Sequence, residues 1–202
     1  MNQVELDHIF IFVKNEQVAR QMLTESGLKI NYSRKHLGQG TANLCACLDD
    51  IFIELIWLDG SEVSEKTKEF KLDLRGQGQG SPFGISWRGE FTCETIDYFP
   101  PYLAEHSISI PVAIESLNLD KPFVFKTPGG SPPENWTNRL AGQRQGTRAK
   151  LQKCTITVPD PENYSLLKKH FPKLDTSKGP KNIHFEIINS ETMQVKNIDW
   201  RI

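Results

Sequence analysis

The stretch RKHLGQGTANLCACLDDIFIELIWLD, from Arg34 to Asp59, holds the signals that decide the fold. It predicts a glycine-containing turn, a strand over 43–48, a tight turn and a second strand over 51–58. The second strand is apolar apart from one carboxylate, that of Glu54. A buried carboxylate without a partner is strongly destabilising. The sequence therefore predicts that another polar group lies beside Glu54.

Two elements precede this stretch and complete a unit with it. The segment VELDHIFIFV, from Val4 to Val13, is rich in β-branched and aromatic residues and predicts a strand covered on both faces. The segment NEQVARQMLTES, which begins at Asn15 as an N-cap and stops before Gly27, has helical spacing of its apolar residues. A short strand is predicted over 28–32. The order over the first sixty residues is thus β-α-β-β-β.

The segment from Ser61 to Pro82 is charged and rich in glycine, which predicts an exposed connection. Its Gly76, Gly78 and Gly80 resemble a phosphate-binding loop only superficially, because such a loop follows a buried strand and opens a helix.

After this connection the pattern repeats more loosely. The predicted elements are strands over 83–88, 107–114, 122–126 and 150–158, a broken helix over 93–106, a helix after Asp160 and a closing hairpin over 182–188 and 194–202. We therefore expect a first module over residues 1–60, a connecting segment over 61–81, and a second, diverged and extended module over 82–202.

Charge and composition narrow the class of partner. The 202 residues include 24 Lys and Arg against 25 Asp and Glu, a net charge of -1 that gives no overall attraction to nucleic acid or an anionic membrane. The segment 139–153 carries five cations, but no aromatic side chains are interleaved for stacking on bases, so a solvated surface or a contact to an anionic ligand is the expectation. A small-molecule partner is favoured.

The four cysteines lack the paired spacing of a zinc site or a disulfide framework, which predicts reduced thiols and a cytoplasmic location. No secretory leader is evident at the N-terminus, and no apolar run reaches the roughly 20 residues of a membrane span.

The motifs in this order resemble those of a known family. LDHIFIFV, the helix after it, the H-x-G-x-G-T-x-N turn with the strand FIELIWL, and then FGISWR, KPFVFKTP and LQKCTITVPDPENYSLLKKHF are similar to the glyoxalase-like domain branch of the vicinal oxygen chelate superfamily. This superfamily includes glyoxalases, bleomycin resistance proteins and extradiol dioxygenases. The resemblance implies an α+β protein of paired βαβββ modules, whose curved mixed sheets surround a cavity.

The resemblance also implies a divalent metal bound by the first and last strands of each module. His8 and Glu54 fall at two of these positions, and an imidazole with a carboxylate suits Zn, Fe, Mn, Co or Ni. Glu54 is then also a candidate catalytic base. The second module departs from the pattern, because Gly84 and Ile85 stand near the place of a second His, and catalytic sites usually have three protein ligands. His184 and Glu186 share a strand face and are candidate supplementary ligands.

Each candidate also has a structural interpretation. His8 and Glu54 can simply stabilise each other in the core, and Glu54 can pair with Arg88 instead. His36 either sets the register of its hairpin or touches a substrate at the cavity mouth. Trp87 and Arg88 are candidate ligand contacts, although core packing is the common role of a tryptophan in such a strand.

Two functions therefore remain open. The first is a metal-assisted lyase, isomerase or dioxygenase acting on a small organic molecule, with His8 and Glu54 as ligands or base. The second is a non-catalytic protein of the same fold that binds or sequesters a small molecule. A third interpretation, a structural homodimer, predicts an exposed apolar patch and no cavity.

Overall fold

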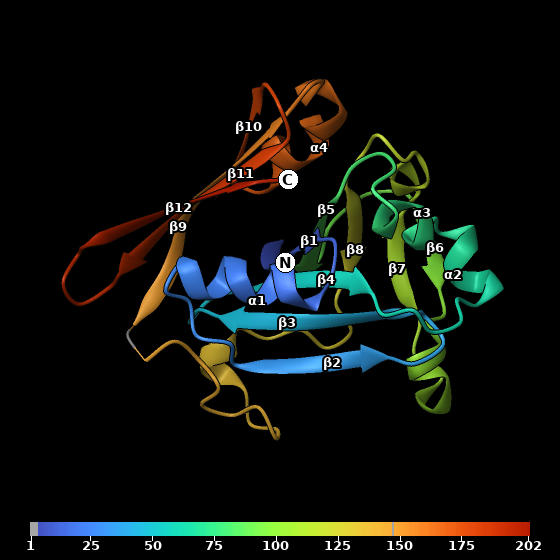
Figure 1. The fold of residues 1–202 in the computed structure, drawn as a ribbon, viewed down its shortest axis with the longest axis horizontal. Helices are drawn as coiled ribbons and strands as arrows, with labels where there is room; N and C mark the ends of the chain where they lie inside the picture. Colours follow the sequence, from blue (N-terminus) through green and yellow to red (C-terminus); the bar gives the residue numbers. More distant parts are fainter. Residues whose placement is uncertain (1–3, 147) are drawn as a thin grey trace.

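The computed structural model describes residues 4–146 and 148–202, which form two β-sheets with short helices (Figure 1). The larger sheet has eight strands in the order β2-β3-β4-β1-β5-β8-β7-β6, and the smaller has four in the order β10-β9-β11-β12. The predicted α+β class with mixed sheets is confirmed.

The first half of the large sheet comprises β1 (Glu5–Phe12), β2 (Tyr32–His36), β3 (Thr41–Cys47) and β4 (Phe52–Leu58), with α1 (Glu16–Glu25) between β1 and β2. The second half comprises β5 (Phe83–Arg88), β6 (Thr95–Tyr98), β7 (Ile110–Ala113) and β8 (Phe123–Lys126). The small sheet comprises β9 (Ala149–Val158), β10 (Leu174–Lys178), β11 (Asn182–Asn189) and β12 (Val195–Arg201). The remaining helices are α2 (Glu65–Glu69), α3 (Leu72–Gly76), α4 (Ser165–His170) and the 3-10 helices η1 (Pro101–His106), η2 (Ile114–Leu117), η3 (Pro133–Asn135) and η4 (Pro161–Tyr164).

The two halves of the large sheet have the same pairing pattern. In the first, β1 is parallel to β4, which is antiparallel to β3, which is antiparallel to β2. The second half repeats these relations: β5 is parallel to β8, which is antiparallel to β7, which is antiparallel to β6. The halves join through antiparallel pairing of β1 with β5, where Ile9 lies opposite Ile85. An approximate twofold axis through this pair therefore relates the two modules.

The second module lacks the helix of the first. Residues 89–94, between β5 and β6, contain no helix, and the helix expected over 93–106 is replaced by the edge strand β6 and the 3-10 helix η1. Pro100 and Pro101 explain the difference, because proline cannot donate the backbone hydrogen bond of a helix interior.

The outer face of the large sheet is covered by different elements in its two halves. Figure 1 shows α1 (blue) running across the first half and the small sheet with α4 (orange to red) beside β5. The rings of Phe83 on β5 and Tyr164 beside α4 are 6.4 Å apart. Ile85 on β5 shares one apolar cluster with Ile156 and Phe185 of the small sheet. The small sheet therefore takes the place that a second helix would occupy.

Alternation along β1 separates two apolar clusters. Ile9 and Ile11 pack into the outer cluster, whereas Phe10 and Phe12 pack into an inner cluster with Ile56 of β4. Successive side chains of a strand point to opposite faces. The inner face, which His8 shares with Phe10 and Phe12, is thus the concave face of the large sheet.

The segment expected as an exposed connection is partly buried. Phe70 and Leu72 join the inner cluster, and the side chain of Arg75 on α3 is 1% exposed. The Arg75 guanidinium donates hydrogen bonds to the carbonyl oxygens of Ser81, Ser116 and Lys121 at 2.8–2.9 Å. Burial lowers the pKa of Arg75 to about 10, so the group stays protonated at neutral pH. Because the carbonyl partners of Arg75 include residues far away in the sequence, no local pattern indicates that this cation is buried.

The large sheet curls until its two edges meet. Gln39 follows the edge strand β2, and Tyr98 ends the opposite edge strand β6. The Tyr98 hydroxyl donates a hydrogen bond to Gln39 Oε1 at 3.0 Å. In the described residues, no helix has both the length and the apolar character needed to cross a membrane.

Candidate functional site

The concave face of the large sheet encloses a cavity of about 310 Å³. Most of its wall is aromatic or aliphatic, with Phe10, Phe52, Phe123 and Phe125 among the rings. The polar residues gathered on its first-module side are His8, Arg34, His36, Gln39, Asn43 and Glu54. The cavity is therefore mainly apolar with a concentrated polar end, which is typical of small-molecule sites.

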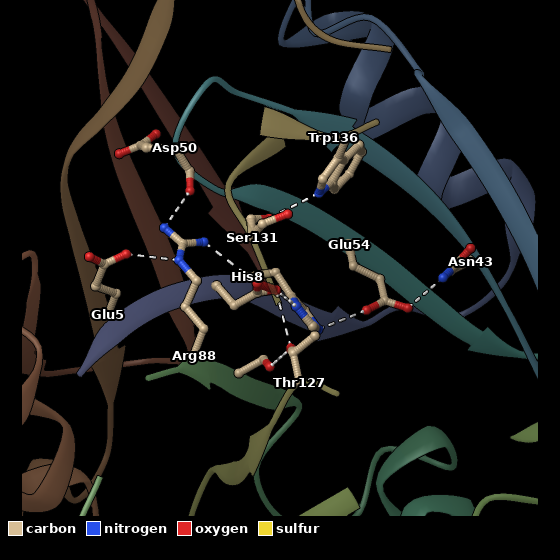
Figure 2. A network of polar contacts seen from close by, with 11 residues as sticks. Glu5, His8, Asn43, Asp50, Glu54, Arg88, Thr127, Ser131 and Trp136 are labelled. Carbon is tan, nitrogen blue, oxygen red and sulfur yellow. Dashed lines mark hydrogen bonds and ion pairs between the residues drawn. The ribbon is translucent and has the colours of Figure 1, made fainter. Parts of the chain in front are cut away.

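His8 and Glu54 are brought together in this cavity. β1 and β4 are neighbouring parallel strands, and both side chains point to the concave face, as Figure 2 shows. The His8 Nε2 atom lies 3.5 Å from Glu54 Oε2, and the two residues are 5% and 7% exposed. The polar groups beside the Glu54 carboxylate are thus the His8 imidazole and the Asn43 amide, which donates a hydrogen bond to it at 2.6 Å. The Arg88 guanidinium pairs with other carboxylates.

The other side of the His8 ring is held by a carboxylate. His8 Nδ1 lies 3.0 Å from Asp7 Oδ2, which also accepts a hydrogen bond from the Thr127 hydroxyl at 3.1 Å. An ionised carboxylate can only accept, so Nδ1 donates the hydrogen bond to Asp7. Nε2 faces the second carboxylate, that of Glu54. The ring stacks on Phe52 with 4.2 Å between centroids. The position of the His8 ring is therefore set by contacts on three sides.

Arg88 lies behind this network and outside the cavity lining, which corrects its expected role as a ligand contact. Its guanidinium donates to Glu5 Oε2 at 2.8 Å and lies 3.5 Å from Asp7 Oδ1 (Figure 2). Arg88 ends β5, beside the start of β1. It therefore supports the carboxylate that holds His8.

Asn43 connects Glu54 to His36. Its Oδ1 accepts from the Arg34 backbone N–H at 2.8 Å, and its Nδ2 donates to Glu54 Oε1 at 2.6 Å. The same Nδ2 lies 3.4 Å from His36 Nε2, and His36 Nδ1 lies 2.8 Å from Thr41 Oγ1. Since Nδ2 can only donate, His36 Nε2 accepts, and Nδ1 carries the proton. Burial lowers the pKa of His36, which favours this neutral form.

The network continues to the seam between the sheet edges. Gln39 Nε2 donates to Thr41 Oγ1 at 2.9 Å, and Gln39 Oε1 accepts from Tyr98. Burial raises the pKa of Tyr98 to about 12, so this phenol remains a donor at neutral pH. Burial also raises the pKa of Tyr102, whose ring lies 4.8 Å from that of His36. Polar contacts thus run from Glu54 to the opposite edge of the sheet.

Trp87 does not line the cavity, contrary to its expected role as a ligand contact. It is 2% exposed, belongs to the outer cluster and packs against Phe91 at 5.0 Å between ring centroids. Strand alternation on β5 explains this, because Ser86 pairs with His8 and leaves its neighbour Trp87 on the opposite face. His184 and Glu186 lie on β11 in the small sheet, where His184 pairs with Asp199 at 2.8 Å.

The donor set does not fit a tightly held metal ion. The twofold axis through Ile9 and Ile85 exchanges the position of His8 with that of Gly84, and the position of Glu54 with that of Phe125. A Cβ at residue 84 would overlap the Phe10 ring. The described residues contain no group of three or more His, Cys, Asp and Glu side chains that could hold a metal. Two ligands remain where protein metal sites usually have at least three.

Sequence reasoning missed several members of the site. Asn43 was expected as the end of a turn motif and the first residue of a strand, but not as a member of the site. Cys45 pairs with Glu54, and Asn43 lies two residues before Cys45, which places it on the concave face. The alternate residues Tyr32, Arg34 and His36 share a face of β2, and this spacing was a usable signal. Tyr98 and Tyr102 come from the second module, and nothing local indicates their contact with the first.

Residues 6–97 match a family model described as a glyoxalase-like domain. Among solved structures, a hypothetical protein from Staphylococcus aureus is similar at 15% identity and a TM-score of 0.48, over 93% of this chain and 82% of that one. A triple mutant of 4-hydroxymandelate synthase from Streptomyces coelicolor is similar at 9% identity and a TM-score of 0.49, over 96% of this chain. This chain spans 62% of the length of that synthase chain. No match was found among the curated proteins.

Proposed function

We propose that this chain binds a small organic molecule in the cavity of its large sheet. The match of residues 6–97 to a glyoxalase-like domain and the paired arrangement of the strands in the large sheet support this proposal. The ligand places a hydrogen-bond-donating group, a hydroxyl or an N–H, against Glu54 and His8. The part of the ligand next to this group is apolar and contacts the aromatic wall.

One observation carries this proposal: Glu54 Oε2 and His8 Nε2 approach each other without a good hydrogen bond. Their separation of 3.5 Å is longer than the 2.7–3.2 Å range of N–H···O bonds. The other polar atoms of the pair are occupied, Glu54 Oε1 by Asn43 and His8 Nδ1 by Asp7. A polar atom facing an apolar cavity is stabilised by a partner. A hydroxyl or N–H of the ligand that donates a hydrogen bond to Glu54 supplies that partner.

The wall supports the same type of ligand. Phe10, Phe52, Phe123 and Phe125 present ring faces and edges within one cavity. Aromatic pairs prefer offset-stacked or edge-to-face geometry and add stabilisation beyond burial of area. A cavity of about 310 Å³ is at the lower end of ligand sites. A molecule with a single ring and few further atoms suits both observations.

Thermal shift and calorimetry with neutral ring compounds that carry a hydroxyl or N–H, such as phenol, benzyl alcohol and indole, test the proposal. Glu54→Gln keeps the shape of the side chain and removes its charge. We expect binding by the wild-type protein and roughly tenfold weaker binding by this variant, because hydrogen bonds to charged groups contribute about 1.5–3 kcal/mol.

Glu186→Gln is the matched control, since Glu186 is a partly buried carboxylate on the small sheet, away from the cavity. It leaves the affinity unchanged if the ligand binds at Glu54. Equal losses in both variants, or no binding of any ring compound that carries a hydroxyl or N–H, charged or neutral, would reject the proposal.

A metal-assisted lyase, isomerase or dioxygenase is the second candidate. The observation in its favour is that His8 Nε2 and Glu54 Oε2 face one point in the cavity. The small number of protein ligands counts against it. Titration with Zn, Fe, Mn, Co and Ni ions one at a time decides between the two. Tight binding that is lost in His8→Gln supports the metal-dependent function, and its absence leaves ligand binding alone.

A further inference from the structure

We propose that the ligand is an organic anion, a small carboxylic acid, whose carboxylate pairs with Arg34 at the mouth of the cavity. This inference rests on the proposed function, since it assigns the end of the ligand that lies away from Glu54. It is carried by the position of Arg34, the surroundings of its side chain and the separation of the two charged residues.

Arg34 lies on the face of β2 that borders the cavity. It shares this face with Tyr32 and His36, and all three line the cavity while Arg34 is also exposed to solvent. Because Arg34 both lines the cavity and is exposed to solvent, it lies at the mouth of the cavity. Among the described lining residues, Arg34 is the sole Lys or Arg and Glu54 is the sole Asp or Glu. The cavity thus has one formal positive and one formal negative side chain.

Within the described part of the chain, no carboxylate lies within 4 Å of the Arg34 guanidinium. Two other arginines already have partners. Arg75 donates hydrogen bonds to backbone carbonyls, and Arg88 pairs with Glu5 and Asp7. Glu54 is engaged by Asn43 and lies beside His8. An anion bound at the mouth therefore meets a guanidinium that no described carboxylate contacts.

The groups around Arg34 favour an anion and do not compete for it. Burial lowers the pKa of His36, which favours its neutral form, and the Tyr102 ring packs against it. Burial keeps the Tyr102 phenol protonated by raising its pKa. Tyr102 lines the cavity, and its hydroxyl makes no hydrogen bond to another described residue, so it is available as a second donor. A guanidinium next to a phenol donor suits a carboxylate, which accepts several hydrogen bonds.

Strand register gives the length of ligand that spans the two ends. Arg34 pairs with Asn43, which pairs with Ile56, two residues beyond Glu54 on β4. With neighbouring strands about 4.8 Å apart and a rise of about 3.4 Å per residue, the Cα atoms of Arg34 and Glu54 are on the order of 12 Å apart. Both side chains shorten this gap. An acid with one ring and a donor group at its far end bridges it.

Matched pairs of acid and primary amide test the inference, because the amide keeps the shape and removes the charge. Suitable pairs, in which a hydroxyl lies at the far end of the ring, are 4-hydroxybenzoate with 4-hydroxybenzamide, and 4-(hydroxymethyl)benzoate with its amide. We expect the wild-type protein to bind at least one acid roughly fivefold to tenfold more tightly than its amide, as for a partly exposed ion pair. This preference falls as salt is added.

Arg34→Gln and Lys35→Gln form the matched variants. They remove the same charge from adjacent residues of β2, but Lys35 does not line the cavity. We expect Arg34→Gln to abolish the preference for the acid while the amide affinity stays unchanged, and Lys35→Gln to preserve the preference.

Equal affinity of the wild-type protein for acid and amide would overturn the inference, as would equal losses in the two variants. If amides or neutral ring compounds bind in a manner sensitive to Glu54→Gln but no acid is preferred, the proposed function stands and the inference fails. If no compound of any kind binds, both are rejected.

Discussion

At the scale of single residues, one amide side chain organises the polar end of the cavity. Asn43 accepts a hydrogen bond from the Arg34 backbone and donates to both Glu54 and His36. Both of its N–H groups and its carbonyl oxygen are used, so it has one stable orientation. The direction of Glu54 and the tautomer of His36 both follow from it.

Replacing this amide by a carboxylate tests that role. In Asn43→Asp a second carboxylate takes the place of the donor 2.6 Å from Glu54 Oε1, and we expect a loss of about 3–5 kcal/mol in stability at neutral pH. One proton shared between two carboxylates raises their pKa in the folded state above the unfolded value. Stability is then partly regained as the pH falls toward about 5. Asn43→Ala is the control, and urea unfolding at several pH values would contradict the idea if both variants showed the same pH profile.

His36 predicts a pH dependence of the wild-type protein. Its folded pKa is lowered by burial, and the nearby charges of Glu54 and Arg34 act in opposite directions. Below about pH 6.5 the unfolded chain gains a proton on His36 that the folded protein does not take. Stability is therefore fully present above this pH and falls, by at most about 1.4 kcal/mol per pH unit, as the pH is lowered. His36→Gln should flatten this slope in urea midpoints measured from about pH 5 to 7.5; an unchanged slope would contradict the assignment.

At the scale of elements, the family resemblance predicted the pairing of His8 with Glu54, because it placed them on the first and last strands of one module. Alternation within each strand could not do this alone, since the register of β1 against β4 is needed to put both side chains on one face. Alternation along a single strand does not tell which of its two faces lines the cavity. For this reason Trp87 was expected on the cavity side, whereas it packs into the outer cluster. The burial of the α2–α3 segment depends on contacts between distant residues, such as Arg75 with the carbonyl of Ser116.

The packing of β1 on β5 yields a stability prediction. A Cβ at Gly84 would overlap the Phe10 ring, so Gly84→Ala should lower the free energy of unfolding by about 1–3 kcal/mol. Phe10→Leu removes the clash, and the double variant should lose less than the sum of the two single variants. Gly146→Ala is the control, because a Cβ there meets no atom within 4 Å. Additive losses in the double-mutant cycle would show that the ring does not fill this space.

At the scale of the whole molecule, one apolar core joins the two sheets. Trp87 of the large sheet and Trp200 of the small sheet belong to the same cluster of buried residues, as do Ile85 and Phe185. A core that is continuous in this way has no internal surface along which the sheets separate without exposing apolar area. The small sheet is therefore a structural part of the second module.

This continuity predicts a single cooperative unfolding transition. Variants that retain only Trp87 or only Trp200 report on the large and the small sheet respectively. Their fluorescence transitions in urea should coincide with each other and with the loss of far-UV circular dichroism. An earlier transition for Trp200 would show that the small sheet unfolds independently.

Part of the cavity wall is contributed by residues outside the strands. Tyr102 and Leu103 lie on the short 3-10 helix η1, Ile108 follows it, and Pro128 comes after β8. None of these four residues takes part in strand pairing. Substitutions there can reshape the hollow while every ladder hydrogen bond of the barrel-like sheet is kept. Ligand selectivity can therefore change through substitutions at these four positions with little effect on the sheet. Substitutions among the polar residues on the strands, such as Asn43, would instead break several hydrogen bonds at once.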